Sequence, residues 1–143
     1  MKVERILDLK GSHAATVTPD AKISAVLAAL ESEDVGALVV STDGLHIDGI
    51  ISERDVVRGL LSLGSKVLDH QVHELMSSDV VTCTADDHVA AVMALMDDRN
   101  IRHVPITNTG KLAGIVSIRD IVKLRLNEVQ VEADAMRQYI GTA

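Results

Sequence analysis

The sequence predicts an α+β fold built from two tandem copies of one βαββα unit. Residues 12–20 align with residues 78–86 at an offset of 66, and the two stretches share Ser, Thr, Thr and Asp at matching positions. GIISERD at 49–55 and GIVSIRD at 114–120 align at an offset of 65 and share five of seven residues. A copy of about 55 residues is marginal for an independent core, so we expect the two sheets to pack against each other.

The two copies show the same order of elements. Short apolar runs at 37–40 and 103–106 predict strands, and glycine-containing turns follow them at 42–44 and 108–110. Because Pro105 has no amide hydrogen, its strand should lie at a sheet edge or donate no bond at that position. Apolar residues spaced i, i+3, i+4, i+7 predict one core-facing amphipathic helix in each copy. These residues are Ile23, Val26, Leu27 and Leu30 in the first copy and Val89, Val92, Met93 and Met96 in the second.

These patterns also predict the domain boundaries. The first repeat should span residues 1–64 and the second residues 76–126, with a linker at 65–75 and a C-terminal helix at 127–143. The chain has no membrane-spanning segment and no apolar secretory signal. Its single cysteine, Cys83, cannot form an internal disulfide. We therefore expect a cytoplasmic protein with no membrane partner.

The composition excludes several classes of function. The net charge is −7, and the chain has no Trp or Phe and one Tyr, which argues against a nucleic-acid partner. The sequence contains no GxGxxG, phosphate-loop or GxSxG motif, so we expect no catalysis. His70 and His73 could share a metal on one helix face, but no third ligand is evident, and we expect a solvated linker helix without metal.

The repeated Ser-x-Arg-Asp motif has two interpretations. Ser-x-x-Asp before an apolar run is typical of a helix capping box. Capping does not explain the arginine, because a cation is unfavourable at the positive end of a helix dipole. A helix start attracts phosphate, arginine adds a matching fork of donors, and a carboxylate can accept from ribose hydroxyls. The motif therefore predicts one nucleotide-binding site at Ser52, Arg54 and Asp55, and a second at Ser117, Arg119 and Asp120.

The order, spacing and duplication of these motifs, from about Ile6 to Leu126, resemble the CBS domain, named after cystathionine beta-synthase. Two such domains form a CBS pair, or Bateman module. The resemblance implies two βαββα repeats packed sheet to sheet about a pseudo-two-fold axis. It also implies a non-catalytic signal-transduction module whose two clefts bind an adenosyl ligand, so that binding shifts the repeats and an unknown protein partner reads the change. AMP is the expected ligand; ADP, ATP, NAD(H) and S-adenosylmethionine are alternatives, as is a ligand-free structural or interaction module.

The resemblance also implies roles for individual residues. Asp55 and Asp120 would hold ribose hydroxyls, and the serines and arginines of the two motifs would face ribose or phosphate. Ile50 and Ile115 would pack on adenine. The loops entering the first strands would offer backbone groups to the base, and residues entering the second strands would line the clefts. These residues are Ser12, Thr16, Val17, Ser78, Val80, Val81 and Thr82 for the loops, and Val35, Gly36, Ala37, Ile101, Arg102 and His103 for the strand entries.

The two copies differ in their capacity to bind phosphate. Arg102 and His103 can contact phosphate, whereas Gly36 and Ala37 carry no side chain that could. If each of these residues serves the cleft of its own repeat, Arg102 and His103 belong with Asp120. We therefore expect the Asp120 cleft to bind phosphate more tightly.

The final helix carries an aliphatic stripe that should need cover. A second copy of the chain is the commonest provider of such cover, and the CBS resemblance implies disc-like dimers. We therefore expect a homodimer. The stripe consists of Val129, Ala133, Met136 and Ile140.

Overall fold

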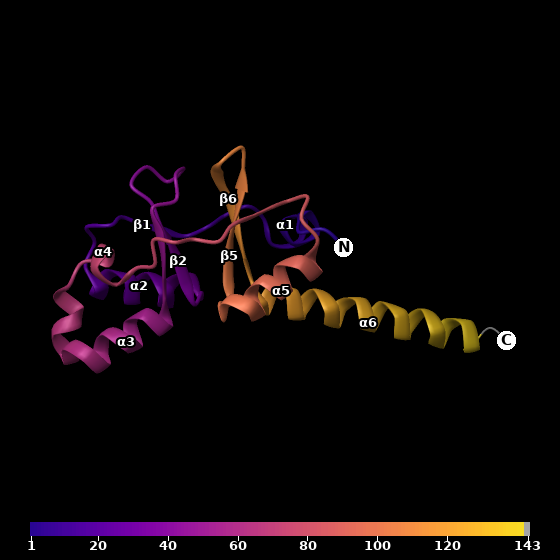
Figure 1. Cartoon of the computed structure of the whole chain (residues 1–143). Helices are drawn as coiled ribbons and strands as arrows, with labels where there is room; N and C mark the ends of the chain where they lie inside the picture. The colour runs from indigo at the N-terminus through magenta and orange to yellow at the C-terminus, as the bar shows by residue number, and fades with distance from the viewer. Residues whose placement is uncertain (142–143) are drawn as a thin grey trace.

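Each repeat folds in the predicted βαββα order in the computed structural model, which describes residues 1–141 (Figure 1). In each sheet the second strand lies in the middle, parallel to the first strand and antiparallel to the third. The predicted fold class is confirmed. The first repeat contains β1 (Thr16–Val17), α2 (Ile23–Glu33), β2 (Ala37–Val40), β3 (Gly49–Ser52) and α3 (Glu53–Leu63). The second contains β4 (Cys83–Thr84), α5 (Val89–Arg99), β5 (His103–Asn108), β6 (Lys111–Ser117) and α6 (Ile118–Gly141).

Alternate residues of the central strands face opposite sides of each sheet. Leu38 belongs to the core that the first repeat forms with its own helices, and Val104 belongs to the corresponding core of the second. Their neighbours Val39 and Pro105 are also buried, but on the other face of each sheet. Figure 1 shows the two sheets next to each other, with α2 and α3 outside the first and α5 outside the second.

Pro105 lies in a central strand, so the prediction of an edge strand is wrong. The alternative prediction, that Pro105 donates no backbone bond, is reflected in where β4 begins. Its counterpart Val39 donates its amide to the Ala15 carbonyl oxygen at 3.2 Å. A proline cannot make this bond, and β4 begins only at Cys83, one residue later than the counterpart of Thr16 would place it.

Segments outside the two βαββα units complete both cores. Helix α1 (Glu4–Lys10) precedes the first repeat but packs on the second, where Val3 and Ile6 are buried. The 3₁₀ helix η1 (Gly64–Asp69) and α4 (Val72–Leu75) pack on the first repeat, where Val67 and Val72 are fully buried. Residues 65–75 connect the repeats, but the expectation of a solvated linker is wrong for these two valines.

The two added segments occupy pseudo-symmetric positions. Val3 donates its amide to the Asp87 carbonyl oxygen, and Val72 donates its amide to the Ala21 carbonyl oxygen, both at 2.9 Å. Each bond ties the segment to the turn that precedes the first long helix of a repeat. The N-terminal part of the chain is therefore part of the second repeat's core.

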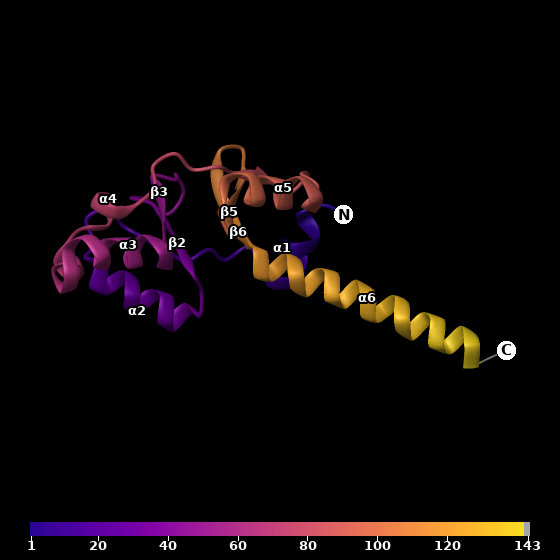
Figure 2. The same ribbon diagram turned by 60° about the horizontal axis from the view of Figure 1, so that its bottom comes forward.

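Helix α6 runs without a break from Ile118 to Gly141, because no proline or glycine interrupts it before Gly141. The prediction of a separate helix from residue 127 is therefore wrong in its start, and residues 142–143 of that prediction lie outside the described residues. Beyond Leu124 the helix extends away from both sheets (Figure 2). In the described part of the chain, no helix is long and apolar enough to cross a membrane.

Two of the eight residues expected to face the cores do not. Leu27 and Met93, which occupy matching positions of α2 and α5, are 39% and 40% exposed. Their neighbours Val26 and Val92 are buried. Each helix therefore buries a narrower stripe than its sequence suggests.

Gly49→Ala should destabilise the fold. A Cβ at Gly49 would lie 2.7 Å from the Met76 sulfur and 2.8 Å from the Ser77 carbonyl oxygen, and the latter is backbone that cannot rotate away. Overpacking of this kind lowers the free energy of unfolding by roughly 1–3 kcal/mol, which urea denaturation would measure. Gly141→Ala, whose Cβ meets nothing within 4 Å, is the matched control; equal effects of the two changes would contradict the close approach at Gly49.

Candidate functional site

Both Ser-x-Arg-Asp motifs form capping boxes. The Ser52 amide donates to Oδ2 of Asp55 at 2.8 Å, and the Ser117 amide donates to Oδ2 of Asp120 at 2.9 Å. The Asp120 amide donates in return to the Ser117 hydroxyl at 3.1 Å. The capping interpretation of serine and aspartate is therefore correct. Because these bonds use Oδ2, capping does not engage Oδ1 of Asp55.

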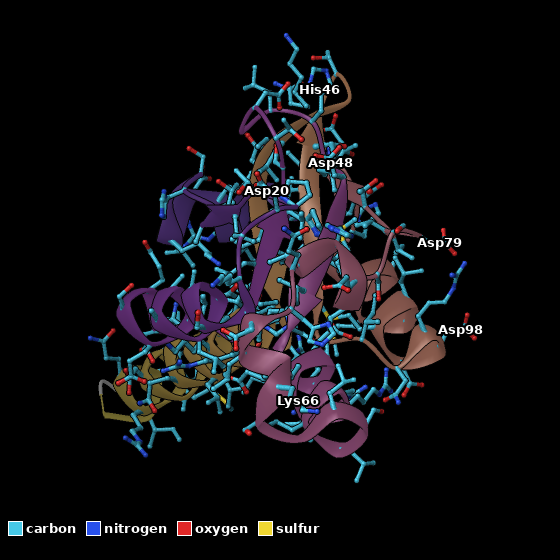
Figure 3. All side chains as sticks on the ribbon, turned by 90° about the vertical axis from the view of Figure 1, so that its left-hand side faces the viewer. Asp20, His46, Asp48, Lys66, Asp79 and Asp98 are labelled. Carbon is cyan, nitrogen blue, oxygen red and sulfur yellow. The ribbon has the colours of Figure 1, made fainter. Side chains whose placement is uncertain are left out.

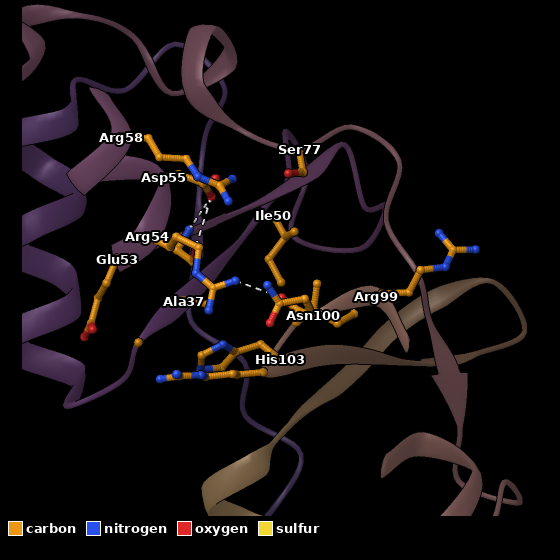
Figure 4. A pocket seen from close by; sticks show the side chains of 14 residues that line it. Ala37, Ile50, Glu53, Arg54, Asp55, Arg58, Ser77, Arg99, Asn100 and His103 are labelled. Atoms are coloured by element: carbon orange, nitrogen blue, oxygen red, sulfur yellow. Dashed lines mark hydrogen bonds between the residues drawn. The ribbon is translucent and has the colours of Figure 1, made fainter. Parts of the chain in front are cut away.

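A cleft of about 350 Å³ opens between the two repeats beside Asp55 (Figure 4). We call it the Asp55 cleft. Its walls come from β2, β3 and the start of α3 on one side, and from the end of α5 and the start of β5 on the other. The lining residues are Gly36, Ala37, Ile50, Ser52, Glu53, Arg54, Asp55, Arg58, Ser77, Arg99, Asn100, Ile101, Arg102 and His103.

The Asp55 cleft is basic although the chain is acidic. Four arginines line it against two carboxylates, in a chain with a net charge of −7. Carboxylates such as Asp79 and Asp98 project from the outside of the molecule (Figure 3). Arg54 donates from Nη1 to the Asn100 carbonyl oxygen at 2.8 Å, which joins the two repeats across the cleft (Figure 4).

The pairing of Arg102 and His103 with the Asp120 cleft is wrong, because both side chains line the Asp55 cleft. The start of β5 in one repeat faces the start of α3 in the other. Gly36 has a part in this arrangement. A Cβ on Gly36 would lie 3.2 Å from Cε1 and 3.3 Å from Nε2 of His103, so the missing side chain makes room for the imidazole.

The His103 imidazole is biased towards its neutral form. Burial lowers its pKa below the ordinary value, and the charges of Lys10 and Arg102 act in the same direction, while Asp120 opposes them. The ring thus lies in the Asp55 cleft and also within the electrostatic reach of Asp120.

The second motif has a different environment. Nζ of Lys10, from the end of α1, donates to Oδ2 of Asp120 at 2.8 Å and to the Ile115 carbonyl oxygen at 2.9 Å. Burial would raise the pKa of Asp120, but the bonds from Lys10 and Ser117 outweigh it and hold the pKa below its usual range. Asp120 is therefore an ionised carboxylate that already has a cationic partner.

The Arg119 side chain does not line the Asp55 cleft. Its Nη1 lies 3.9 Å from Oδ2 of Asp34, at a hollow of about 340 Å³. The residues lining this hollow are Leu27, Leu30, Glu31, Asp34, Val35, Gly36, Glu53 and Arg119. Ile115, Ser117 and Asp120 are not among them.

The Asp55 cleft unites nine of the predicted contact residues, but not the strand-entry loops. Ser77 lines the cleft where Ser78 was expected, and Val17 packs against the first repeat's core. Sequence reasoning missed Arg58, although it follows Arg54 by one helical turn and so shares its face. The predicted residues outside the cleft are Ser12, Thr16, Val17, Val35, Ser78, Val80, Val81, Thr82, Ile115, Ser117, Arg119 and Asp120.

Other side chains capable of chemistry have ordinary partners. His70 contacts Glu74 at 3.2 Å and His73 contacts Gln71 at 2.6 Å. Within residues 1–141 no three metal-ligating side chains gather. Burial raises the pKa of the Cys83 thiol to about 11, which keeps it protonated.

A sequence profile described as CBS domain matches both repeats, at residues 8–62 and 72–127. The mitochondrial CBS domain-containing protein CBSX3 of Arabidopsis thaliana is 32% identical over 127 residues. The match covers 86% of this chain and 62% of that protein, so the chain spans less than two thirds of its relative's length.

Solved structures with related sequences share the fold. A CBS-domain containing protein from Agrobacterium tumefaciens is 37% identical, with a TM-score of 0.84 over 87% of this chain and 99% of that one. A CBS domain protein from Pyrobaculum aerophilum, complexed with AMP, is 27% identical, with a TM-score of 0.73 over 84% of this chain and 89% of that one.

His103→Gln should make folding stability less sensitive to acid. The native state binds a proton at His103 less readily than the unfolded chain, so stability falls as the pH drops through the ordinary histidine value of about 6.5. The fall in melting temperature between about pH 7.5 and about pH 5.5 would measure this loss of stability, and the fall should be smaller in His103→Gln than in the wild type. The same substitution at the exposed His88 is the control; an equal loss in wild type and His103→Gln would contradict the prediction.

Proposed function

This chain belongs to the CBS domain family, and from that premise we propose that it is a regulatory CBS pair that binds an adenine nucleotide in the Asp55 cleft. One observation carries the proposal. A single cleft of about 350 Å³ combines an apolar residue, a carboxylate at a helix start and four arginines. This size lies within the range of small-molecule sites in proteins, at about 300–1,000 Å³.

Each part of the cleft suits one part of a nucleotide. Ile50 supplies apolar surface for the base. The Asp55 carboxylate can accept from the ribose hydroxyls through Oδ1 while Oδ2 caps α3. The amides at the start of α3 and the guanidinium groups of Arg58 and Arg102 suit phosphate oxygens.

AMP is the nucleotide we propose. The structure from Pyrobaculum aerophilum was solved with AMP, and it resembles this chain over most of its length. ADP, ATP, NAD(H) and S-adenosylmethionine contain the same adenosine group and differ in what is attached to it. The arginine cluster favours the ligands with phosphate.

Regulation follows from the position of the cleft. Its walls belong to both repeats, so a ligand that contacts Asp55 and Arg102 links them and favours one relative arrangement. We infer that a protein partner reads this arrangement and that the chain itself catalyses no reaction. The rival interpretation is an interaction module that binds no ligand, and a cytoplasmic location stays a prediction from the sequence.

AMP should stabilise the protein, and Arg102→Ala should weaken its binding. A thermal-shift screen with AMP, ADP, ATP, NAD, NADH and S-adenosylmethionine would identify the ligand class. Loss of one charge-assisted bond of about 1.5–3 kcal/mol should reduce AMP affinity roughly 10- to 100-fold, measured by calorimetry. Adenosine, which lacks phosphate, should bind both proteins equally.

Arg137→Ala is the matched control for this experiment, because Arg137 lies on the distant part of α6. No thermal shift with any adenosyl ligand would refute the proposed function and favour the ligand-free module. Equal weakening of adenosine and AMP by Arg102→Ala would show that Arg102 does not act on phosphate.

We also propose that the module is a homodimer. The stripe on α6 is exposed, at 58% for Val129, 66% for Met136 and 71% for Ile140. Leu27 and Met93 add apolar surface on α2 and α5. A two-fold related copy could cover these surfaces with the same surfaces of its own.

Light scattering at high micromolar concentration should give the mass of a dimer. Val129→Glu combined with Met136→Glu should shift the protein to a monomer, because a dimer would bury these charges without partners. Asn127→Glu, on the same helix, should leave the dimer intact. A monomer in the wild type would exclude this assembly.

A further inference from the structure

The two repeats differ in what bonds the isoleucine of the Gly-Ile-Ile/Val motif. In the first repeat Ile50 exchanges backbone bonds with Ser77, each at 3.0 Å. Ile115 is the counterpart of Ile50, and its carbonyl oxygen accepts instead from Nζ of Lys10 at 2.9 Å. An ammonium group thus takes the place of a backbone amide, and the same ammonium reaches Asp120.

Helix α1 delivers Lys10 to this position. A Cβ on Gly114 would lie 2.8 Å from Cδ2 of Leu7, just as a Cβ on Gly49 would lie 2.7 Å from the sulfur of Met76. Leu7 and Met76 therefore hold equivalent positions against the two sheets. Helix α4 ends at Leu75, just before Met76. Helix α1 instead continues past Leu7 by almost a turn and ends at Lys10.

The Lys10–Asp120 pair is partly withdrawn from solvent. The side chains are 31% and 19% exposed, and the two charged atoms are 2.8 Å apart. Lys10 bonds Oδ2, the oxygen that also caps α6, and its charge neutralises the carboxylate. A ribose hydroxyl that bonded Oδ1 of Asp120 would therefore meet a carboxylate that is already paired, and would gain less than from the Asp55 carboxylate, which has no such ammonium partner among residues 1–141.

The surroundings of the second motif also disfavour phosphate. Glu33 and Asp34 are the counterparts of Arg99 and Asn100, and Gly36 is the counterpart of Arg102. Arg119, the counterpart of Arg54, lies 3.9 Å from the Asp34 carboxylate, whereas Arg54 bonds to a neutral carbonyl. The cluster of four arginines that suits phosphate lies at the first motif.

We propose that Lys10 neutralises the Asp120 carboxylate by bonding the oxygen that also caps α6, and so confines nucleotide binding to the Asp55 cleft. Lys10 is then a specificity-determining residue that acts by pairing with this carboxylate. The inference rests on the proposed function, because it assumes that the first motif binds a nucleotide. It assigns the two equivalent aspartates different tasks: Asp55 binds ribose, and Asp120 holds α1.

Removal of the ammonium should open a second site. Calorimetry should find one AMP per wild-type chain, whereas Lys10→Met should bind a second adenosyl ligand. Adenosine is the sharper probe for that second site, because the acidic residues near it disfavour phosphate. Lys10→Arg keeps the charge and should retain a single site. Lys2→Met is the matched control, since Lys2 forms only a long, exposed pair with Asp86 at 3.9 Å.

Substitutions of the two aspartates identify the site. Asp120→Asn in the wild type should leave AMP affinity unchanged, whereas Asp55→Asn should weaken it. Asp120→Asn added to Lys10→Met should remove the second adenosine site.

The outcomes separate this inference from the proposed function. If the wild type binds no adenosyl ligand, the proposed function is wrong and the inference falls with it. If the wild type binds one AMP and Lys10→Met still binds a single AMP and a single adenosine, the proposed function stands and the role of Lys10 is wrong. Two equivalent sites in the wild type would also overturn it. If Lys10→Met fails to fold, Lys10→Gln, which keeps a donor for the Ile115 carbonyl, takes its place with the same expectations.

Discussion

Helix α1 precedes the first repeat but packs on the second, and this packing, on which the rest of the structure depends, holds the two halves of the chain together. Val3 and Ile6 complete the core of the second repeat, and Val67 and Val72 complete the core of the first. A unit of this size is marginal as an independent core. Because the second core takes Val3 and Ile6 from the segment that precedes the first repeat, the two repeats fold as one body. A cleft between them can then keep a defined shape.

The duplicated backbone carries two different sets of side chains. The same capping box starts α3 and α6, and both aspartates use it to fix the first turn of a helix. Capping therefore accounts for the aspartate in both copies, and it does not require that both copies bind a ligand. The difference arises at the ends of α2 and α5, where Glu33 corresponds to Arg99 and Gly36 to Arg102. The Asp55 cleft is basic and open, whereas at the second motif Lys10 is bonded to Asp120.

His103 connects the two motifs. Its ring packs over Gly36 in the Asp55 cleft, and its pKa responds to Lys10 and Asp120 on the other side. A phosphate beside the ring would favour protonation, whereas Lys10 opposes it. The ring thus lies in the Asp55 cleft and within the electrostatic reach of Lys10 and Asp120.

The sequence by itself determined the elements of the two repeats, because their signals are local. Helix periodicity, the Ser-x-x-Asp cap and the glycine turns depend on residues a few positions apart, and the duplication made each signal visible twice. Tertiary structure alone decided which repeat supplies which wall of a cleft. Arg102 and His103 serve the aspartate of the opposite repeat, and Lys10 reaches Asp120 across more than a hundred residues of chain. Such contacts depend on how the two sheets pack, and the repeat alignment contains no trace of that packing because it compares equivalent positions of the two repeats and not the surfaces that face each other.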